Sequence, residues 1–299
     1  MAFKLKNKET LGEGICRIAH EQAGCIADSL KTKRGQCQLG AVHEARKSVK
    51  KLRALVRLIA DDLGERTLEE ENRTFQKIGR ALSPLRDAEV LVKTLEKLRG
   101  RYKKQTTAAT FASALKLFKA QRNSVVKHLS APIKKVRKRL RKSIQRIDDW
   151  PLKALQWDDL YCGIRRAYKE ARQAFAAACD QPNDENFHEW RKRVKELWYD
   201  LRILGAVRPE VMDDLAHQAK VLGEYLGEDH DLAVAGRALE EKRLNKASSQ
   251  VLASLIERRR FQLQRAAFDL GNRLFVEKPK AFAQRIEGYW KTWRAEVRN

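Results

Sequence analysis

The chain has 299 residues, and its 63 Lys and Arg against 39 Asp and Glu give a formal net charge of +24 at pH 7. Such an excess of positive charge indicates an anionic partner. Only 15 Gly and 6 Pro are present, too few for the many tight turns of a β-sandwich or barrel, so helices are favoured.

Helical periodicity runs through most of the chain, and we find no convincing strand. Ser83-Pro84 and Ser130-Ala131-Pro132 are expected to begin helices, with serine as the cap and proline in the first turn. The last helix, with Trp290 and Trp293, is expected to pack on the second half. In chain order, helices are expected over residues 9–33, 42–57, 65–82, 86–103, 108–129, 133–147, 158–179, 187–202, 210–226, 230–244, 247–275 and 278–294.

The positive charge is concentrated in the first half. Residues 1–150 hold 36 Lys and Arg against 16 Asp and Glu, whereas residues 151–299 hold 27 against 23. Within residues 93–146 there are 18 basic side chains and a single acid, Glu96. A solvated helix face normally mixes signs, so this one-sided segment favours a bound polyanion.

Two blocks of sequence recur in the same order. Residues 42–52 match residues 187–197, and residues 78–87 match residues 222–231 at nearly the same offset. A chance match would not bring a second match at this spacing. Because connections are short, we expect an all-α fold of two four-helix bundles related by internal duplication, over residues 1–150 and 151–299. The boundary is expected near Asp148–Trp157, with the halves packed together.

Each recurring helix has a cationic stripe opposite an apolar one. A projection at 100° per residue separates the two faces, so one face packs and the other is free to bind. The stripes consist of His43, Arg46, Lys47, Lys50, Arg53 and Arg57 in the first half, and of His188, Arg191, Lys192, Lys195 and Arg202 in the second.

The sequence gives no support for catalysis. His43-Glu44 and His188-Glu189 begin like the zinc motif H-E-x-x-H, but Lys47 or Lys192 stands at the second histidine position. The common nucleotide-binding and hydrolase signatures are absent. We therefore expect no enzyme activity, no metal site and no cofactor.

The acids of the second block have a different role. The segment Glu228-Asp229-His230-Asp231 offers metal-type ligands, but only the final acid persists in the first half, as Asp87. Asp87 and Asp231 are interpreted as helix N-terminal acids or as partners that orient neighbouring cations.

Cysteines and hydropathy indicate the compartment. The five cysteines (Cys16, Cys25, Cys37, Cys162 and Cys179) form no C-x-x-C pair, so reduced cytosolic thiols fit better than a disulfide framework or a zinc ribbon. No apolar run approaches the length of a membrane span, and the start lacks a secretion signal. We expect a cytoplasmic protein without membrane insertion.

The duplicated helix, apolar-His-x-x-Arg-x-x-x-Lys-x-x-Leu with a later apolar-Gly-x-x-Leu…Asp helix, resembles the CHAD family, the conserved histidine α-helical domain. Residues 42–57, 78–91, 187–202 and 222–234 carry this resemblance, which spans nearly the whole chain. It implies one CHAD domain made of two bundles with pseudo-twofold symmetry, and a basic surface or channel that binds inorganic polyphosphate.

A row of Arg and Lys three and four residues apart can follow a chain of closely spaced phosphates. From the one-sided segment we add four cations to both stripes, on charge alone. The predicted polyphosphate-binding residues are His43, Arg46, Lys47, Lys50, Arg53, Arg57, Lys134, Lys135, Lys138, Arg141, His188, Arg191, Lys192, Lys195 and Arg202.

Two alternatives remain open for the function. A nucleic-acid-binding protein without sequence specificity would also present basic helices, although single-strand binders interleave aromatic rings that the first stripe lacks. A scaffold recruited to polyphosphate granules would bind and do nothing else. For His43 and His188 a packing role at a helix start is the alternative to phosphate binding. In the free protein neighbouring cations should lower the pKa values of both histidines, and in the binding role bound phosphates should raise them.

Overall fold

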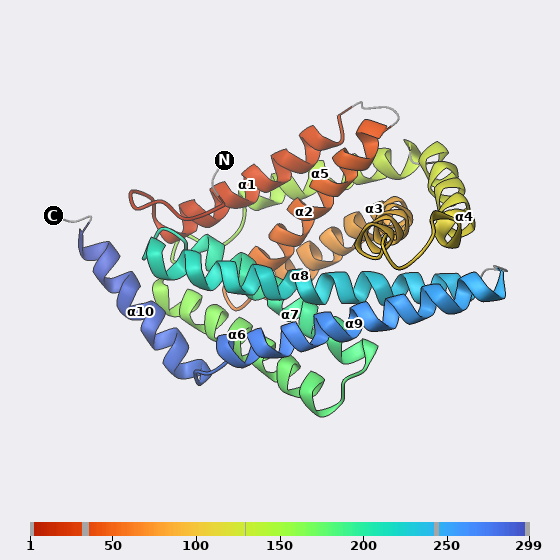
Figure 1. Ribbon diagram of the computed structural model, residues 1–299. Helices are drawn as coiled ribbons and strands as arrows, with labels where there is room; N and C mark the ends of the chain where they lie inside the picture. Colours follow the sequence, from red (N-terminus) through yellow and green to blue (C-terminus); the bar gives the residue numbers. More distant parts are fainter. Residues whose placement is uncertain (1–2, 32–35, 129, 242–244, 297–299) are drawn as a thin grey trace.

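Ten α-helices and no strand form the part of the chain that the computed structural model describes, residues 3–31, 36–128, 130–241 and 245–296 (Figure 1). The prediction of an all-α fold is confirmed. The first half holds α1 (Leu11–Ser29), α2 (Gln36–Leu58), α3 (Glu65–Arg101), α4 (Ala108–Lys127) and α5 (Ser130–Ile147). The second holds α6 (Trp157–Asp180), α7 (Asp184–Ile203), α8 (Pro209–Glu240), α9 (Lys246–Leu274) and α10 (Pro279–Glu296).

Several helix starts follow from local chemistry. At α1, the Thr10 hydroxyl accepts from the Glu13 amide at 3.3 Å, and the Glu13 carboxylate accepts from the Thr10 amide at 2.9 Å. The helix predicted over residues 158–179 is confirmed, because α6 begins at Trp157, where Asp159 accepts from the Gln156 amide at 2.8 Å. α5 begins at Ser130 with Pro132 in its first turn, also as predicted.

The predicted break at Ser83-Pro84 is wrong, because α3 continues through Pro84. Leu82 and Leu85 are both buried, so a continuous helix keeps both in the core. Side chains also supply hydrogen bonds near the proline, which has no amide of its own. The Gly79 carbonyl accepts from the Ser83 hydroxyl at 3.1 Å and from Arg46 Nη1 at 2.8 Å.

The corresponding break predicted in the second half is also wrong. Residues 210–226 and 230–244 were expected to form two helices, but the single helix α8 runs through Gly227. Gly223 and Gly227 lie inside the helix where α7 approaches. A Cβ on Gly223 would meet Lys195 Cε at 3.0 Å, and one on Gly227 would meet Arg191 Nε at 3.5 Å. Gly223 therefore makes room for the Lys195 side chain, whereas a Cβ at Gly227 would make only an ordinary contact, and neither glycine ends α8.

Some predicted ends lie at residues that the structure leaves undescribed. Residues 32–35, 129 and 242–244 fall at the predicted ends of the helices 9–33, 108–129 and 230–244, and lie outside the described residues. The side chain of Cys37 is likewise not described. Among the described cysteines, Cys16, Cys25, Cys162 and Cys179 are free thiols.

The two halves share one hydrophobic core. Leu52 and Leu55 of α2 belong to the same buried cluster as Leu197 and Leu201 of α7, so the halves pack together as expected. At Gly163, a Cβ would lie 2.0 Å from the Leu58 carbonyl oxygen, which shows how closely α6 approaches the end of α2.

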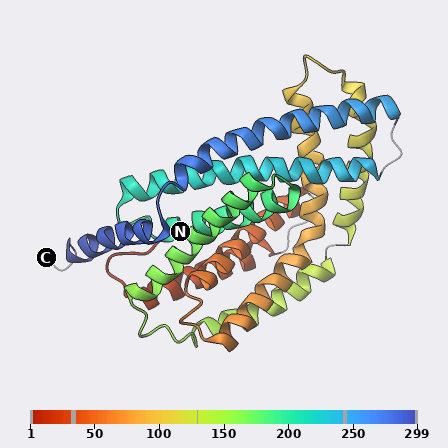
Figure 2. The same cartoon turned by 90° about the horizontal axis from the view of Figure 1, so that it is seen from below.

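A second, smaller core closes one end of the molecule. It brings together the ends of α3, α4, α8 and α9, with Leu95, Phe111, Leu239 and Leu252 among its buried residues. Figure 2 shows the long α8 and α9 pair reaching the α3 and α4 hairpin at this end. The two halves therefore meet at both the centre and this end.

The last helix packs as predicted. α10 lies against α6, with Trp290 and Trp293 both buried. The Trp290 ring stacks on Trp157 at a centroid distance of 4.8 Å. Across the described helices, none combines the length and the apolar character needed to cross a bilayer.

Candidate anion-binding site

The cationic stripes of α2 and α7 meet in the middle of the molecule. α2 packs against α7 and α3 packs against α8, so four helices from two halves surround one region (Figure 1). Lys50 there lies within electrostatic reach of Arg46 on its own helix, of Arg86 on α3, and of Arg191 and Lys195 on α7. We call Arg46, Lys50, Arg86, Arg191 and Lys195 the central cluster.

The central cluster disfavours the protonated form of its two lysines. Burial, reinforced by Arg191 and Arg46, lowers the pKa of Lys50 from 10.5 to about 7. Burial and Arg191 lower the pKa of Lys195 to about 8. Water nevertheless reaches the Lys50 side chain, which is exposed. Lys50 therefore combines an exposed side chain with several cations close by.

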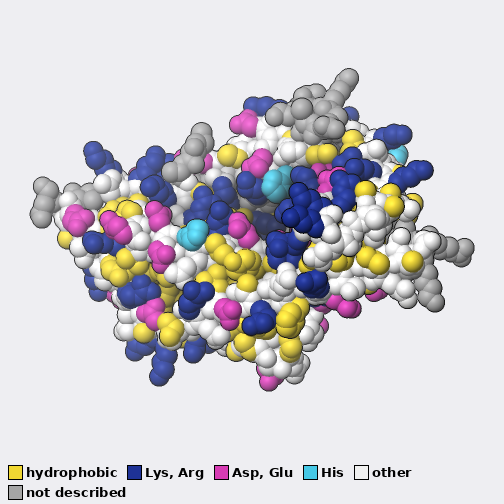
Figure 3. Space-filling view, viewed as in Figure 1, with side chains coloured by type: hydrophobic (Ala, Val, Ile, Leu, Met, Phe, Trp, Pro, Cys, Tyr) yellow, Lys and Arg dark blue, Asp and Glu magenta, His cyan; other side chains and the backbone are white. Residues whose placement is uncertain are grey.

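A cleft of about 320 Å³ opens beside Lys50, between α2 and α3. Its cationic lining residues are Arg46, Lys50, Arg53 and Arg80. On the face viewed in Figure 3, Lys and Arg side chains gather over the middle of the molecule, with a histidine among them. The cleft therefore offers several cations to one anionic ligand.

The two central arginines differ in how they are held. Arg46 donates through Nη1 to the Ser83 hydroxyl at 2.5 Å, in addition to the Gly79 carbonyl. Its equivalent in the repeat, Arg191, lies over Gly227 instead, and its buried Nε has no hydrogen-bond partner anywhere in the described chain. Arg191 is half-buried, and its guanidinium keeps a donor that no residue of the described chain uses.

Two carboxylates stand beside the cations. Burial raises the pKa of Asp87 against the opposing effect of Arg46, and burial raises that of Asp231 against the effect of Arg191. Both lie in the middle of long helices, so their interpretation as helix N-terminal acids is wrong. Neither makes a direct ion pair within the described residues. Two acids among five cations leave the region positive.

The predicted histidines lie at the edge of the cluster. Burial, followed by Arg86, lowers the pKa of His43, and burial, followed by Arg191, lowers that of His188. His188 Nδ1 lies 3.2 Å from His230 Nδ1. Burial, Arg191 and His188 together lower the pKa of His230 to about 4. The neighbouring cations thus act in the expected direction.

Two predicted lysines are paired with acids one turn away. Lys47 Nζ lies 3.0 Å from a Glu44 oxygen, and Lys192 Nζ lies 2.5 Å from a Glu189 oxygen. Both lysines are exposed, and such surface pairs contribute at most about 1 kcal/mol, so a phosphate could replace the acid.

Arg57 and Arg202 lie away from the central cluster. Arg57 forms ion pairs with Glu170 and Glu196 of the second half, which already satisfy its charge. The Arg202 guanidinium stacks on the Trp198 ring at 5.3 Å from the centroid. These two predicted ligands therefore join the halves or pack on aromatic rings.

The four cations predicted on α5 are not brought to the central cluster. Lys134, Lys135, Lys138 and Arg141 are exposed, and α5 packs against α1 and α3. They form part of the outer basic surface, and their role in binding stays a prediction.

The sequence interpretation missed several residues of the site. Arg86 belongs to the central cluster, Lys97 and Arg86 act on Asp231, and Lys93 and Arg237 act on the histidines. Arg86 and His230 occupy equivalent positions in the second matched block. Applying the stripe analysis to that block as well would have found them.

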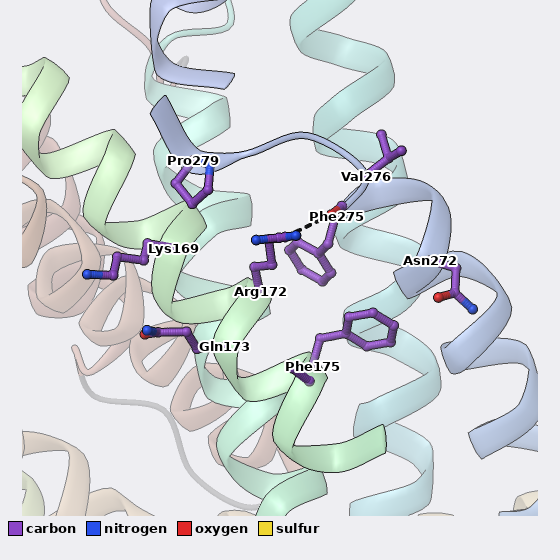
Figure 4. A pocket seen from close by; sticks show the side chains of 9 residues that line it. Lys169, Arg172, Gln173, Phe175, Asn272, Phe275, Val276 and Pro279 are labelled. Carbon is purple, nitrogen blue, oxygen red and sulfur yellow. Dashed lines mark hydrogen bonds between the residues drawn. The ribbon is translucent and has the colours of Figure 1, made fainter. Parts of the chain in front are cut away.

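A larger pocket lies outside this site. It has a volume of about 640 Å³ between α6 and α9, and its lining mixes apolar groups such as Phe175 and Val276 with Lys169 and Arg172. Figure 4 shows Arg172 directed at the Phe275 carbonyl, to which its Nε donates at 3.1 Å. Because that arginine is already engaged, the pocket offers little to a polyanion.

Comparisons with known proteins agree with this architecture. The chain is similar to the crystal structure of the CHAD domain from the plant Ricinus communis, with a TM-score of 0.62 and 19% identity over 92% of this chain and 94% of that one. Two uncharacterized proteins from strains of Mycobacterium tuberculosis are each 32% identical over 120 residues. That match covers 36% of this chain but only 22% of each relative, so the chain spans about a fifth of their length.

The family itself is shown by sequence. The family model described as the CHAD domain matches residues 23–240, which include both matched blocks of the repeat and all of α2, α3, α7 and α8. The chain therefore belongs to the CHAD family.

Proposed function

We propose that this protein binds inorganic polyphosphate through the central cluster and the cleft beside it. The observation that carries the proposal is the convergence of five cations from both halves, with Lys50 at the centre. Like charges held together in a partly desolvated space oppose folding, and an anion that enters would relieve that cost. The CHAD resemblance implies the same ligand.

The geometry favours a slender polyanion. The cleft beside Lys50 is small, about 320 Å³, so a thin ligand fits it more readily than a bulky one. A polyphosphate chain has a negative charge at each unit and no side groups. A nucleic-acid strand carries bases that need aromatic partners. Phe75 is the aromatic residue lining the cleft, and it is fully buried in the core.

We also infer that the two halves arose by duplication and are related by a pseudo-twofold axis. α2 packs on its equivalent α7, and α3 packs on its equivalent α8. Equivalent pairs recur around the site, with Arg46 and Asp87 in one half and Arg191 and Asp231 in the other. A twofold axis between the halves would place a linear ligand across both.

Binding is proposed as the whole function of the site. Its groups hold and neutralise charge, and none is arranged as a nucleophile with a neighbouring base to attack a phosphate. Such a protein would collect wherever polyphosphate is stored, including granules.

The proposal is tested by competition at fixed salt. Labelled polyphosphate bound to the full chain is challenged with unlabelled polyphosphate, single-stranded RNA and duplex DNA of equal total phosphate. Polyphosphate should displace the label at much lower concentration than either nucleic acid. Equal displacement by RNA would favour the nucleic-acid alternative.

A matched pair of variants locates the site. Arg191→Gln should weaken binding about tenfold or more, since charge-assisted contacts contribute about 1.5–3 kcal/mol. Arg137→Gln, which removes an exposed arginine of α5, is the control and should change binding less than threefold. Equal losses in the two variants would show that the outer surface, not the central cluster, binds the ligand.

A further inference from the structure

Lys50 is placed to react as well as to bind. It stands on α2 at the junction of the cleft and the central cluster, and water reaches it. Among the described residues, no carboxylate lies within ion-pair distance of its Nζ, and no hydrogen bond holds it. Its amine is therefore exposed and not held by an ion pair, so a small reagent that enters the cleft can contact it.

We propose that Lys50 is a site of acylation by small acyl phosphates, which the central cluster recruits through their phosphate group. This inference does not rest on polyphosphate binding, because a single phosphate group is sufficient for it. It assigns a covalent modification to a residue that otherwise acts only as a cation.

The neighbours of Lys50 define the reagent. Arg46 from α2, Arg86 from α3, and Arg191 and Lys195 from α7 are cations around it. The Asp87 carboxylate from α3 and the Asp231 carboxylate from α8 also act on Lys50, and they are outnumbered. The Nε of Arg191 is buried and has no hydrogen-bond partner among the described residues, so this guanidinium has an unused donor.

An acyl phosphate carries its electrophilic carbon next to its charge. Held by the guanidinium groups, it would present that carbon to an amine only a few atoms away. A thioester carrier instead keeps its phosphates far from the acyl group, so the same anchoring would not position its carbonyl. The chemistry of the cleft therefore selects acyl phosphates.

The reaction is balanced without any further reagent. The lone pair of Lys50 Nζ attacks the acyl carbon and a C–N bond forms. The bond between that carbon and the bridging oxygen then breaks, and inorganic phosphate leaves with the electron pair. The proton lost from nitrogen passes to water, and the product is a neutral amide.

The protonation state of Lys50 supports this reactivity. With a pKa of about 7, roughly half of its amines are unprotonated at neutral pH, against roughly 1 in 2,500 for an ordinary lysine. Lower basicity removes part of this gain, because nucleophilicity falls as pKa falls. Acylation at pH 7 should still be about tenfold or more faster at Lys50 than at an exposed lysine such as Lys142.

The test uses acetyl phosphate and the full chain. The protein is incubated with the reagent at pH values from about 6 to 9, digested, and analysed by mass spectrometry for acetyl groups on Lys50 and Lys142, an interval that spans the lowered and ordinary lysine pKa ranges. We expect the Lys50 rate to level off above neutral pH while the Lys142 rate keeps rising. Pyrophosphate should protect Lys50 and leave Lys142 unaffected.

Variants distinguish recruitment of the acyl phosphate by the central cluster from simple exposure of Lys50. Arg191→Gln should slow acetylation of Lys50 severalfold, whereas Arg137→Gln on α5 should not. A Lys50 rate equal to or below that of Lys142, or a phosphoryl rather than an acetyl adduct, overturns the inference. Fast acetylation in a protein that fails to bind polyphosphate would leave this inference standing and remove the proposed function.

Discussion

Replacing Lys50 by Met should make the free protein more stable. In the folded state burial and four neighbouring cations oppose the charge of Lys50, whereas in the unfolded chain water surrounds it. Methionine has a similar length and no charge, so it fills the same space without that cost. A binding residue would thus be kept at the expense of stability.

The magnitude follows from the pKa shift of Lys50. A fall from 10.5 to about 7 corresponds to an upper bound of about 4–5 kcal/mol at neutral pH. Because water reaches the side chain, screening reduces this, and we expect a gain of about 1–2 kcal/mol in the free energy of unfolding. For a domain of this size that raises Tm by about 2–6 °C.

The sign of the pH dependence is fixed by the same shift. Between pH 7 and 10.5 the unfolded state binds more protons at Lys50 than the folded state, so this residue makes wild-type stability rise with pH. The advantage of Lys50→Met should therefore be largest near pH 7 and shrink towards pH 10. Thermal unfolding followed by circular dichroism measures it, with Lys142→Met on α5 as the control. A variant less stable than wild type at pH 7, or an advantage independent of pH, would refute the reasoning.

Three further predictions follow from the site. If five cations each hold a phosphate, polyphosphate affinity should fall roughly a hundredfold between about 50 and 200 mM salt, and a titration showing no fall would exclude an electrostatic mechanism. Arg57→Gln should cost up to about 1 kcal/mol of stability by removing the ion pairs of Arg57 with Glu170 and Glu196, which Arg193 still contacts, with polyphosphate affinity unchanged in the same preparation. Bound phosphate should raise the lowered pKa of His230, so polyphosphate affinity should increase as the pH falls from 7 to 5, and it should increase less in His230→Gln. Calorimetry that detects no proton uptake on binding would contradict this prediction.

The sequence was sufficient to predict an all-helical chain and the two stripes, but not the continuity of α3 and α8. Period and repeat locate α2 and α7, and their shared pattern selected Arg46, Lys50, Arg191 and Lys195, which the structure brings together in the central cluster. The reason is that an apolar face on each helix must be buried, which turns the opposite face outwards or towards a cavity. Helix periodicity thus predicts which face of each single helix is buried.

The pattern along one helix does not predict which residues of other helices it contacts. Arg57 has the same spacing as Lys50, but its end of the stripe meets Glu170 and Glu196 from distant parts of the chain. Pro84 suggested a break because local propensity disfavours it in a helix, while the burial of Leu82 and Leu85 favours continuity. In both places tertiary contacts outweigh a local signal.

The two halves hold their central arginines differently, so we expect them to contribute differently to binding. Ser83 holds Arg46 in the first half, whereas Gly227 stands at the matching position in the second and leaves the Nε of Arg191 unused. A buried donor without a partner costs stability until a ligand arrives, so a larger share of its interaction is available for binding. The half with the smaller net charge therefore contributes the less satisfied arginine. We expect affinity for a polyanion to depend on where unpaired charge is buried more than on how many lysines and arginines each half contains.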